Sequence, residues 1–464
     1  MLKDLLRKFR LFNDSFKNRT NYEENASGFR SFAYRIKTIN FPFLLDKFNS
    51  EDYFYWSVSN NNLSMLGVKS VLDIKVNGLD RIEETDNKIL QIKENFENNW
   101  HEAGLKFTPM FLGGMKFVPN EQGNVWSDFS DSDWMLPKFL FYKNRSDYFL
   151  IINFRASTFN NLTLENEILD IINLLIRNSA PVEQKNIKIT STIAHNGWND
   201  KVLNALKRIH EGTIQKIVLS REVEWDLSDT PDISSLIQKL SNRYPKCYVF
   251  AFHRNNSVFF GASPEKLAKI QDGWIETDAL AGSISRGQNH EEDLKLEREL
   301  LSSEKNLNEQ DAVVQFITGS LSKISNNIEF SEKPIIRKLP NIQHLWTPIR
   351  AKLSKELKLF SILKNLHPTP AICGAPWMNA LQSITQMEEH DRGLYAGIIG
   401  WFSLENKAEF AVAIRSALLK NKKVYGYAGC GIVEGSDPDA EFEETELKLK
   451  PIKNLFVNEE KRQS

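Results

Sequence analysis

Residues 409–450 read EFAVAIRSALLKNKKVYGYAGCGIVEGSDPDAEFEETELKLK, and this stretch decides the fold class. Its two apolar runs, 409–418 and 423–433, predict consecutive strands. The polar SDPD segment then marks the start of a helix, because Asp437 fits an N-cap and Pro438 suits the first helical position, where its missing N–H costs nothing. We therefore expect two strands followed directly by a helix that begins near Pro438.

Strands also follow one another upstream of this stretch, from residue 214 onward. Apolar runs such as QKIVLSREVEW, CYVFAFH, SVFFGAS and WIETDALAG precede a long charged helix, expected over 289–324, and a further strand is expected over 393–402. Strands in runs favour an α+β fold with largely antiparallel sheets. A doubly wound nucleotide-binding fold is disfavoured, because YGYAGCGIVEG matches neither GxGxxG nor a loop that ends in GK[ST].

The first 195 residues show strand and helix patterns without a recognisable chemical motif. Segment 107–119 (FTPMFLGGMKFVP) predicts a strand bent at its paired glycines, 147–155 a second strand, and 163–178 a helix. The chain then passes from strand to helix near residue 196, with Asn196 or Asn199 as the N-cap. No linker rich in Gly, Pro or Ser separates the two halves, so we expect one continuous core.

Composition excludes several classes of protein. The charges nearly cancel, with 59 Lys and Arg against 60 Asp and Glu, so a nucleic-acid binder, which needs a basic excess, is not expected. No apolar run reaches the roughly 18 residues of a membrane span, and the N-terminus lacks the apolar stretch of a signal peptide. Three widely separated cysteines suit a reducing compartment. We expect a cytoplasmic enzyme that acts on a small molecule.

Three glutamates are candidate ligands of a divalent cation. Glu441 and Glu444 share one face of the C-terminal helix, with Lys448 one turn further along. Glu309 lies where the long helix turns apolar, so its carboxylate is expected to face the interior and to need a partner. Mg²⁺ takes one or two carboxylates together with water and substrate oxygens. The alternatives are a solvated charged face at 441–448 and a lysine salt bridge for Glu309.

Strand and turn positions supply further candidates. Lys216 lies on an apolar strand, where desolvation can lower a lysine pKa enough for a general base, although such a lysine more often snorkels or pairs. Glu265 directly follows an apolar strand and suits either a protonated general acid or a simple turn. Arg415 is a charged residue within an apolar run, and such an arginine suits bidentate binding of a carboxylate. Gly429 permits close approach of the backbone to an anion. The EEHDR segment at 388–392 is interpreted as a turn.

Ten blocks of the C-terminal half resemble the chorismate-utilising enzymes, the family of isochorismate, anthranilate, aminodeoxychorismate and salicylate synthases. In order they are KIVLSR, FFGASPEKL, TDALAGSISRG, LLSSEKNLNEQ, IQHLWT, LHPTPAICGAP, DRGLYAGIIGW, EFAVAIRSALL, YAGCGIVEGSDP and EFEETELKLK. FLGGMKF and WSDF…WMLP resemble a weaker N-terminal signature. The resemblance implies one large domain, with two facing antiparallel sheets, helices outside and the active site between the sheets. We expect a divergent N-terminal half at 1–195, a chorismate-binding catalytic core at 196–456 and a polar tail at 457–464.

The resemblance also implies roles for single residues. Glu309 and Glu444 correspond to direct Mg²⁺ ligands and Glu441 to a ligand through water, with the metal holding the ring carboxylate of chorismate. Arg415, with backbone amides near Gly429, corresponds to the clamp on the enolpyruvyl carboxylate. The expected pocket-lining residues are Gly282, His344, Tyr395 and Lys448, with a structural role as the alternative for His344.

Two positions indicate the nucleophile. Anthranilate synthases usually carry Gln where this chain has Lys216, and aminodeoxychorismate synthases carry a nucleophilic Lys where it has Ala281. The chain therefore matches the branch that uses water, and LHPTPAICG resembles isochorismate synthases more than salicylate synthases. The implied reaction is attack of water, activated by Lys216, at C2 of the ring, while Glu265 protonates the departing C4 hydroxyl. Desolvation has to keep the lysine neutral and the glutamate protonated.

Two other functions remain open from the sequence. One is a salicylate synthase, which would go on to eliminate pyruvate, and the other is an inactive homologue that binds chorismate as a sensor. An amidotransferase partner is not expected, because ammonia chemistry needs the other nucleophile pattern. Asn306, Trp377 and His390 depart from the family pattern, and Trp377 in particular bears on the pocket rim and on substrate affinity.

Overall fold

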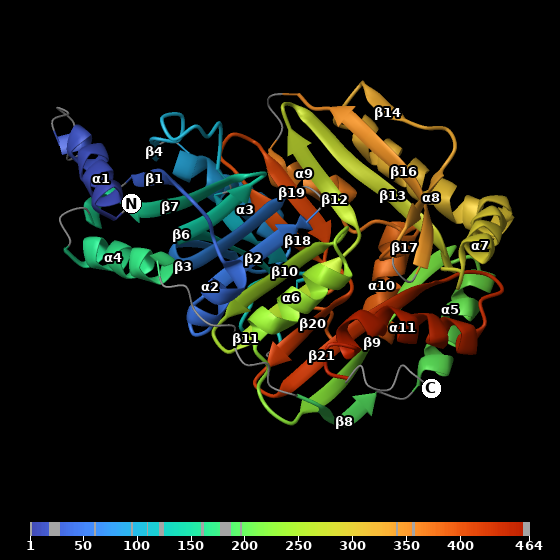
Figure 1. Ribbon diagram of the computed structural model, residues 1–464. Coiled ribbons are helices and arrows are strands. Elements are labelled where there is room, and N and C mark those ends of the chain that lie inside the picture. The colour runs from blue at the N-terminus through green and yellow to red at the C-terminus, as the bar shows by residue number, and fades with distance from the viewer. Residues whose placement is uncertain are drawn as a thin grey trace.

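The computed structural model describes residues 2–17, 28–59, 62–93, 96–108, 110–119, 125–158, 162–176, 187–194, 197–339, 342–354 and 358–457. Its strands form one hydrogen-bonded network, and every pairing between the described strands is antiparallel except that of β1 with β4. Figure 1 shows this network as two layers of strands with helices around them.

The network divides at β6 (Ser132–Asn144), which pairs with β3 along one edge and with both β5 and β7 along the other. The first branch runs in the order β4 (Phe96–Asn98), β1 (Phe29–Ile36), β7 (Asp147–Arg155), β6, β3 (Leu63–Val76), β2 (Tyr53–Val58), β10 (Tyr248–Arg254), β11 (Ser257–Ser263), β20 (Ser416–Lys420), β21 (Lys423–Ile432) and β9 (Lys216–Leu227), with β8 (Ile189–Ala194) and β17 (Gly374–Ala375) on β9. The second runs in the order β6, β5 (Phe111–Met115), β18 (Ile398–Phe402), β19 (Ala408–Val412), β12 (Lys266–Gln271), β13 (Trp274–Ser285) and β16 (Ile342–Lys352), with β14 (Ile328–Phe330) and β15 (Ile335–Lys338) on β16.

One apolar core lies between the branches and draws on both halves of the chain. Trp134 of β6 packs edge-on against Phe402 of β18, with 5.3 Å between the ring centroids. A second core lies on the outer face of the first branch, beneath α2 and α6. Because both faces of β10 and β11 are covered, these strands are buried along their whole length, which explains their unbroken apolar runs.

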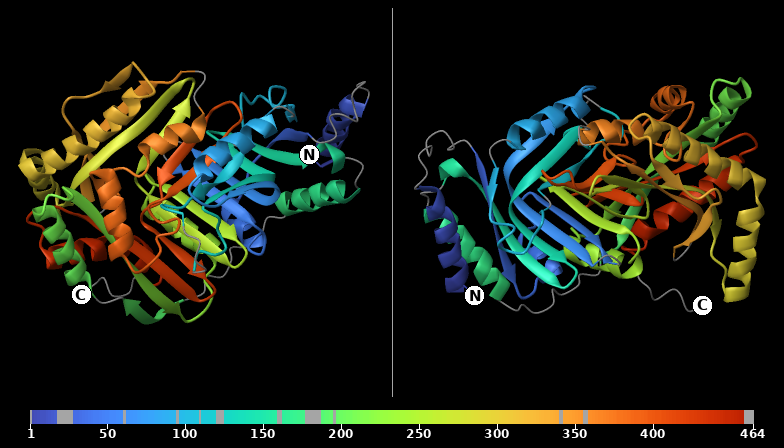
Figure 2. Two further views of the ribbon diagram at one scale, coloured as in Figure 1. Left: turned by 180° about the vertical axis from the view of Figure 1, so that it is seen from behind. Right: turned by 90° about the horizontal axis from the view of Figure 1, so that it is seen from above.

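Helices cover the outer faces of both branches (Figures 1 and 2). Helices α1 (Leu2–Lys17) and α4 (Leu162–Ile176) lie side by side at the N-terminal end, and α3 (Arg81–Lys93) packs on α9 (Leu359–Leu366). Helices α7 (His290–Ser302) and α8 (Glu304–Ser322) pack on β13 and β16, while α2 (Phe41–Lys47) and α6 (Ile233–Arg243) pack on each other. Helices α5 (Trp198–His210), α10 (Trp377–Met387) and α11 (Pro438–Lys453) flank β9 and β21.

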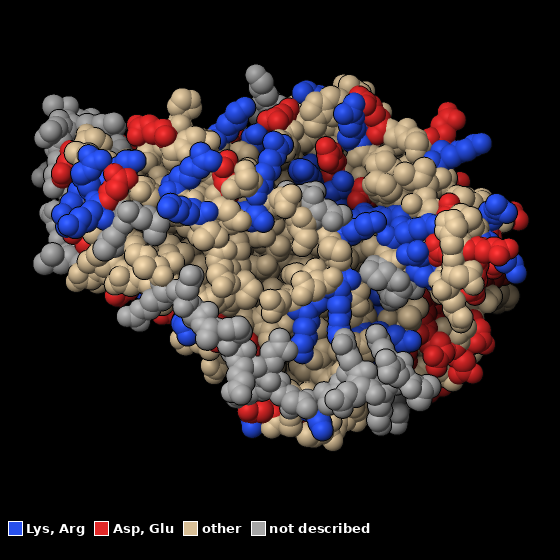
Figure 3. All heavy atoms as spheres, in the orientation of Figure 1, with Lys and Arg blue, Asp and Glu red and all other residues tan. Residues whose placement is uncertain are grey.

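The expected fold class is confirmed: the chain forms one large domain of facing antiparallel sheets with helices outside, and the two sheets are joined through β6. The C-terminal helix begins at Pro438, and the Asp437 side chain caps it by accepting a hydrogen bond from Ala440 N at 2.9 Å. Basic and acidic side chains both occur across the face in Figure 3. Among the described residues, no helix has the length and apolarity to span a bilayer.

Several expectations about element boundaries were wrong. The strands expected over 393–402 and 107–119 are shorter than expected, at Ile398–Phe402 and Phe111–Met115. The helix expected over 289–324 is two helices, because Ser303 adopts an extended conformation and caps the second one, accepting from Asn306 N. The strand expected over 409–418 is likewise two strands, β19 and β20, which are separated at Arg415, where φ is 53°. Helix α5 begins after Gly197, so Asn199 lies within the helix, and Asn196 lies outside the described residues.

Candidate active site

Two of the points at which the chain crosses from one branch to the other are neighbours, and each of these crossings carries a predicted site residue. Glu265 lies between β11 and β12, and Arg415 lies between β19 and β20. Backbone hydrogen bonds tie the crossings together, since Ala262 N donates to Arg415 O and Val412 N donates to Glu265 O, each at 3.1 Å. The topology therefore brings an acid and a cation that are 150 positions apart in sequence to one seam between the sheets.

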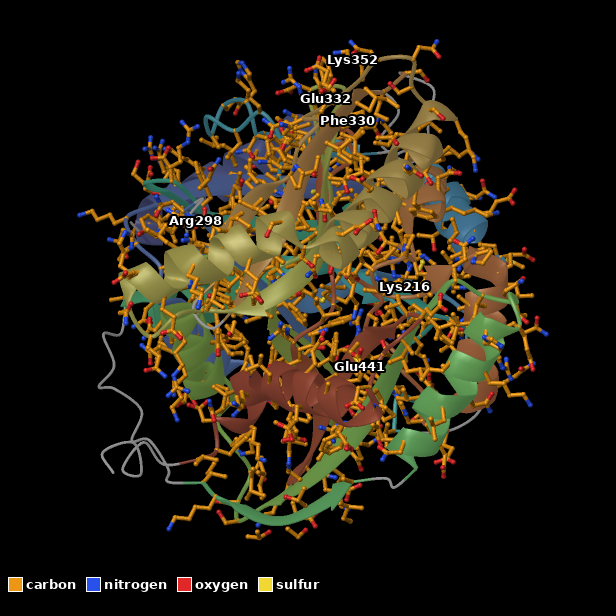
Figure 4. All side chains as sticks on the ribbon, turned by 90° about the vertical axis from the view of Figure 1, so that its right-hand side faces the viewer. Lys216, Arg298, Phe330, Glu332, Lys352 and Glu441 are labelled. Carbon is orange, nitrogen blue, oxygen red and sulfur yellow. The ribbon has the colours of Figure 1, made fainter. Side chains whose placement is uncertain are left out.

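A cavity of about 680 Å³ opens at this seam. Residues of β9, β13 and β21 and of helices α8 and α11 form its wall. In Figure 4 the wall residue Lys216 lies between α8 and α11, and the wall residue Glu441 is labelled on α11. All eleven residues singled out from the sequence line the cavity: Lys216, Glu265, Gly282, Glu309, His344, Tyr395, Arg415, Gly429, Glu441, Glu444 and Lys448.

Glu265 is a buried carboxyl group with a strongly perturbed titration. Burial raises the pKa of its carboxyl to about 7, and the nearby carboxylate of Asp278 contributes in the same direction. The cations Lys448, Arg337 and Lys216 oppose this rise in pKa. The carboxyl therefore still holds its proton in a substantial fraction of molecules near neutral pH, as a general acid requires.

Lys216 forms an ion pair with Glu309 across the cavity. The lysine is only 8 % exposed, and Gly431 on the adjacent strand leaves room for it: a Cβ on that glycine would lie 2.7 Å from Lys216 Cε. Helix α8 is held in place by the buried Gln310, whose Oε1 accepts from Ala281 N at 2.9 Å. The salt bridge considered for Glu309 is thus present, and it joins the expected base to an expected metal ligand.

The carboxylates of α11 lie against the cavity, and Glu441 is buried, so this face is not the solvated charged face considered above. Lys448 contacts Glu444 at 2.7 Å and donates to Gly429 O at 2.9 Å. Burial acts to lower the pKa of Lys448, but Glu444 and Cys430 together outweigh it and the pKa is raised. In return, Lys448 lowers the pKa of Glu444. Glu441 Oε1 accepts from Ser436 Oγ at 2.7 Å.

Two buried polar groups point to an anionic ligand. Arg415 is 8 % exposed, yet among the described residues its guanidinium has no hydrogen-bond or ion-pair partner. His344 Nδ1 lies 2.9 Å from Ser283 Oγ, whereas its buried Nε2 has no partner within the described chain. Burial, together with the positive charge of Arg415, lowers the pKa of His344 to about 3, so the imidazole is neutral. Since buried polar groups are rarely left without hydrogen-bond partners, we infer that a bound molecule supplies partners to the Arg415 guanidinium and to His344 Nε2.

Gly282 allows close approach of the cavity wall to α8. It is the bulged residue of β13, between Ala281 and Ser283, and has a φ of 64°. A Cβ at this position would lie 3.0 Å from the Cβ of Asn306. Any side chain here would therefore be strained by the backbone conformation and would crowd α8. Tyr395 stacks on Tyr427 at 5.3 Å on the same wall.

The segment 388–392, interpreted as a turn, is a loop with a bend at His390, and it carries a buried network that the sequence did not indicate. Its Glu388 and Arg392 form a buried ion pair at 2.6 Å, and Arg392 also donates to Val218 O at 2.7 Å. Ser220 N donates to Glu388 at 2.6 Å, so this network fixes β9, which carries Lys216. No sequence pattern reveals it, because the partners of the loop lie about 170 positions away.

The three departures from the family pattern have different surroundings. Asn306 lines the cavity beside Gly282. His390 bonds Ser220 Oγ at 2.9 Å and is not among the described cavity-lining residues. Trp377 begins α10, is 38 % exposed and also lies off the described wall, so its expected effect on the pocket rim has no structural basis here.

Comparisons with known proteins show the family to which the chain belongs. The family described as chorismate binding enzyme matches residues 15–457. Isochorismate synthase MenF of Bacillus subtilis is 31 % identical over 442 residues, or 93 % of this chain and 94 % of the relative. A salicylate biosynthesis isochorismate synthase of Pseudomonas aeruginosa is 33 % identical over 382 residues, or 80 % of this chain and 79 % of the relative.

Solved structures show the same fold. The structure of MenF, the menaquinone-specific isochorismate synthase from Escherichia coli, matches with a TM-score of 0.79 at 23 % identity, over 93 % of this chain and 95 % of that chain. Anthranilate synthase component I from Streptococcus pneumoniae matches with a TM-score of 0.70 at 22 % identity, over 84 % and 91 %. The resemblance carried by the ten sequence blocks is confirmed, and the chain belongs to the chorismate-binding enzyme family.

Proposed function

We propose that this chain is an isochorismate synthase, an isomerase that adds a hydroxyl group from water at C2 of chorismate and releases the C4 hydroxyl group. The observation that carries the proposal is the composition of one cavity wall, where Lys216 and a protonatable Glu265 line the same space and Ala281 stands where a nucleophilic lysine would be needed for amine chemistry. The names of the two sequence relatives given above favour the same activity.

Substrate binding falls to the groups that have no partner among the described residues. Arg415 presents its guanidinium to the enolpyruvyl carboxylate, a bidentate match of planar groups. The neutral imidazole of His344 contributes a hydrogen bond from its free Nε2. Lys448, Tyr395 and Gly282 shape the remaining wall. These contacts hold the ring between the two proton-transfer residues.

Two proton transfers then complete the exchange of hydroxyl groups. Lys216 removes a proton from the water that attacks C2, and both conjugated ring double bonds shift by one position as the C4–O bond breaks. Glu265 delivers its proton to the departing C4 oxygen, which leaves as water. The buried position of Glu265 favours this role, because the carboxyl holds a proton that an exposed glutamate would lose near pH 4.5.

The donor set of α8 and α11 fits Mg²⁺, which prefers carboxylate oxygens and water. Glu309 and Glu444 would hold the ion directly and Glu441 through water, and the ion would neutralise and orient the ring carboxylate of chorismate. In the described part of the chain no three acidic, histidine or cysteine side chains already surround a common point. Glu309 and Glu444 each pair with a lysine instead, so these pairs must open when the ion binds.

The test is incubation of the purified chain with chorismate and MgCl₂, followed by chromatography of the products. We expect isochorismate as the product, no pyruvate, and loss of turnover on addition of EDTA. Pyruvate and fluorescent salicylate would establish a salicylate synthase, and no turnover at all would favour a chorismate-binding sensor. Ammonium salts in place of an amidotransferase subunit should yield no anthranilate.

A further inference from the structure

A group of charged side chains lies behind Glu265, outside the described cavity wall. Asp278 of β13 contacts Lys266 of β12 at 3.2 Å and Arg337 of β15 at 3.0 Å. The Asp278 side chain is only 3 % exposed, and those of Lys266 and Arg337 are 16 % and 19 % exposed. Burying a carboxylate is costly unless it is paired, and here one carboxylate serves two cations.

The fold places this group next to the acid end of the cavity. Lys266 directly follows Glu265 in the chain, so its contact with Asp278 brings that carboxylate close to the crossing between β11 and β12. Arg337 lies opposite His344 in the pairing of β15 with β16, and His344 lies opposite Ser283 of β13. Neither Asp278 nor Arg337 belongs to the described cavity wall, so they do not reach the substrate.

We propose that Asp278 and Arg337 are an opposed positioning pair that acts through Glu265: Asp278 keeps the proton on the general acid, and Arg337 limits how tightly that proton is held. The assignment of Glu265 as the acid rests on the proposed function. The influence of the pair on the Glu265 proton is independent of the proposed function, because it follows from charge and burial alone.

The charges that face Glu265 come from every element packed around it. Asp278 of β13 raises the pKa of Glu265, whereas Lys448 of α11, Arg337 of β15 and Lys216 of β9 lower it. Lys448 is itself paired with Glu444, and Lys216 with Glu309. On the β12–β13 side, Lys266 is shared between Asp278 and, at 4.0 Å, the half-exposed Glu276. Asp278 is therefore the carboxylate that opposes the surrounding cations.

Two single variants separate this proposal from a purely structural role, because they should move the proton in opposite directions. Asp278→Asn keeps the side-chain shape but leaves two cations without their counter-charge, so Glu265 should lose its proton at lower pH. Arg337→Gln removes a cation and leaves Asp278 paired with Lys266, so Glu265 should lose its proton at higher pH. Each displacement should amount to at least about half a pH unit. The double variant should return close to the parent value.

Glu329→Gln is the matched control. Glu329 of β14 pairs with Arg350 of β16 at 2.6 Å, and β14 is a neighbour of β16 as β13 and β15 are, but both side chains are exposed. Water screens such a pair, so its loss should not displace the Glu265 titration.

The measurement is a pH titration of the infrared absorption of the protonated Glu265 carboxyl, obtained as the difference between each protein and its Glu265→Gln derivative. The pH profile of kcat/KM gives the second readout, through the break that Glu265→Gln abolishes. Opposite displacements in the two variants support the proposal. Displacements of the same sign, or an unchanged titration in Arg337→Gln, which alters a half-buried residue of a short edge strand, would overturn it. The two variants could shift the Glu265 titration in opposite directions while the parent protein forms no isochorismate. That result would refute the proposed function and still support the positioning pair.

Discussion

Replacing Glu265 by glutamine should make the protein more stable at high pH and leave its stability at low pH unchanged. The side chain is buried, and its pKa rises from the ordinary 4.5 to about 7 in the folded chain. The folded state therefore binds this proton more tightly than the unfolded state does. Stability contributed by the proton is present below about pH 4 and is lost as the pH rises to about 7, the usual direction for a carboxyl whose pKa is raised.

The size of this effect on stability follows from the pKa shift of Glu265. A pKa difference of this size corresponds to about 3 kcal/mol, which is a large part of the stability of a typical domain. Glutamine resembles the protonated acid at every pH and avoids this cost. We therefore expect Glu265→Gln to match the parent near pH 4 and to exceed it by about 3 kcal/mol above about pH 8, while losing turnover.

Urea unfolding of both proteins at a series of pH values measures this difference. The exposed Glu443 offers the matched control, because a carboxyl that stays hydrated gains little from replacement by an amide. The reasoning would be refuted if the difference in unfolding free energy between Glu265→Gln and the parent changed from pH 4 to pH 8 by no more than the error of the method. A variant that is less stable than the parent at the alkaline end would also refute it.

Three further predictions concern catalysis and its metal. Lys216→Ala should lower kcat by about 10²–10⁴-fold with little change in KM, whereas Arg415→Ala should chiefly raise KM, and steady-state kinetics that show the reverse split would contradict the two roles. Glu309→Ala and Glu444→Ala should each abolish turnover with the far-ultraviolet circular dichroism unchanged; near-normal rates in either variant, or activity insensitive to EDTA, would remove the metal from the account. Gly431→Ala should lower kcat by displacing Lys216, since the added Cβ would lie 2.7 Å from its Cε, and an unaltered kcat would show that the lysine is free to move.

Much of the site could be predicted from the sequence because its residues lie in short, locally decided motifs. The Asp437 cap and the start of α11 at Pro438 depend only on neighbouring residues, and they fix which face of the helix carries Glu441 and Glu444. Lys216, Glu265, Glu309, Arg415 and Gly429 were candidates from their positions on strands, turns and a helix, and the family resemblance then supplied Gly282, His344 and Tyr395. All eleven line one cavity, although their roles stay predictions.

What the sequence could not predict depends on contacts between distant segments. The apolar run around Arg415 has the pattern of one strand, and only the passage between two sheets breaks it there. Ser303 divides a continuous helical pattern by capping α8. The buried pair of Glu388 and Arg392 is invisible locally, because it bonds β9 from across the fold.

The central claim, that water attacks C2 while the C4 hydroxyl leaves, is tested most directly by turnover in water enriched in the heavy oxygen isotope. The account predicts that each isochorismate molecule carries one solvent oxygen at C2 and that the C4 oxygen of chorismate is released, as mass spectrometry of the product would show. Isochorismate that retains the original oxygen, or a product other than isochorismate, would contradict it.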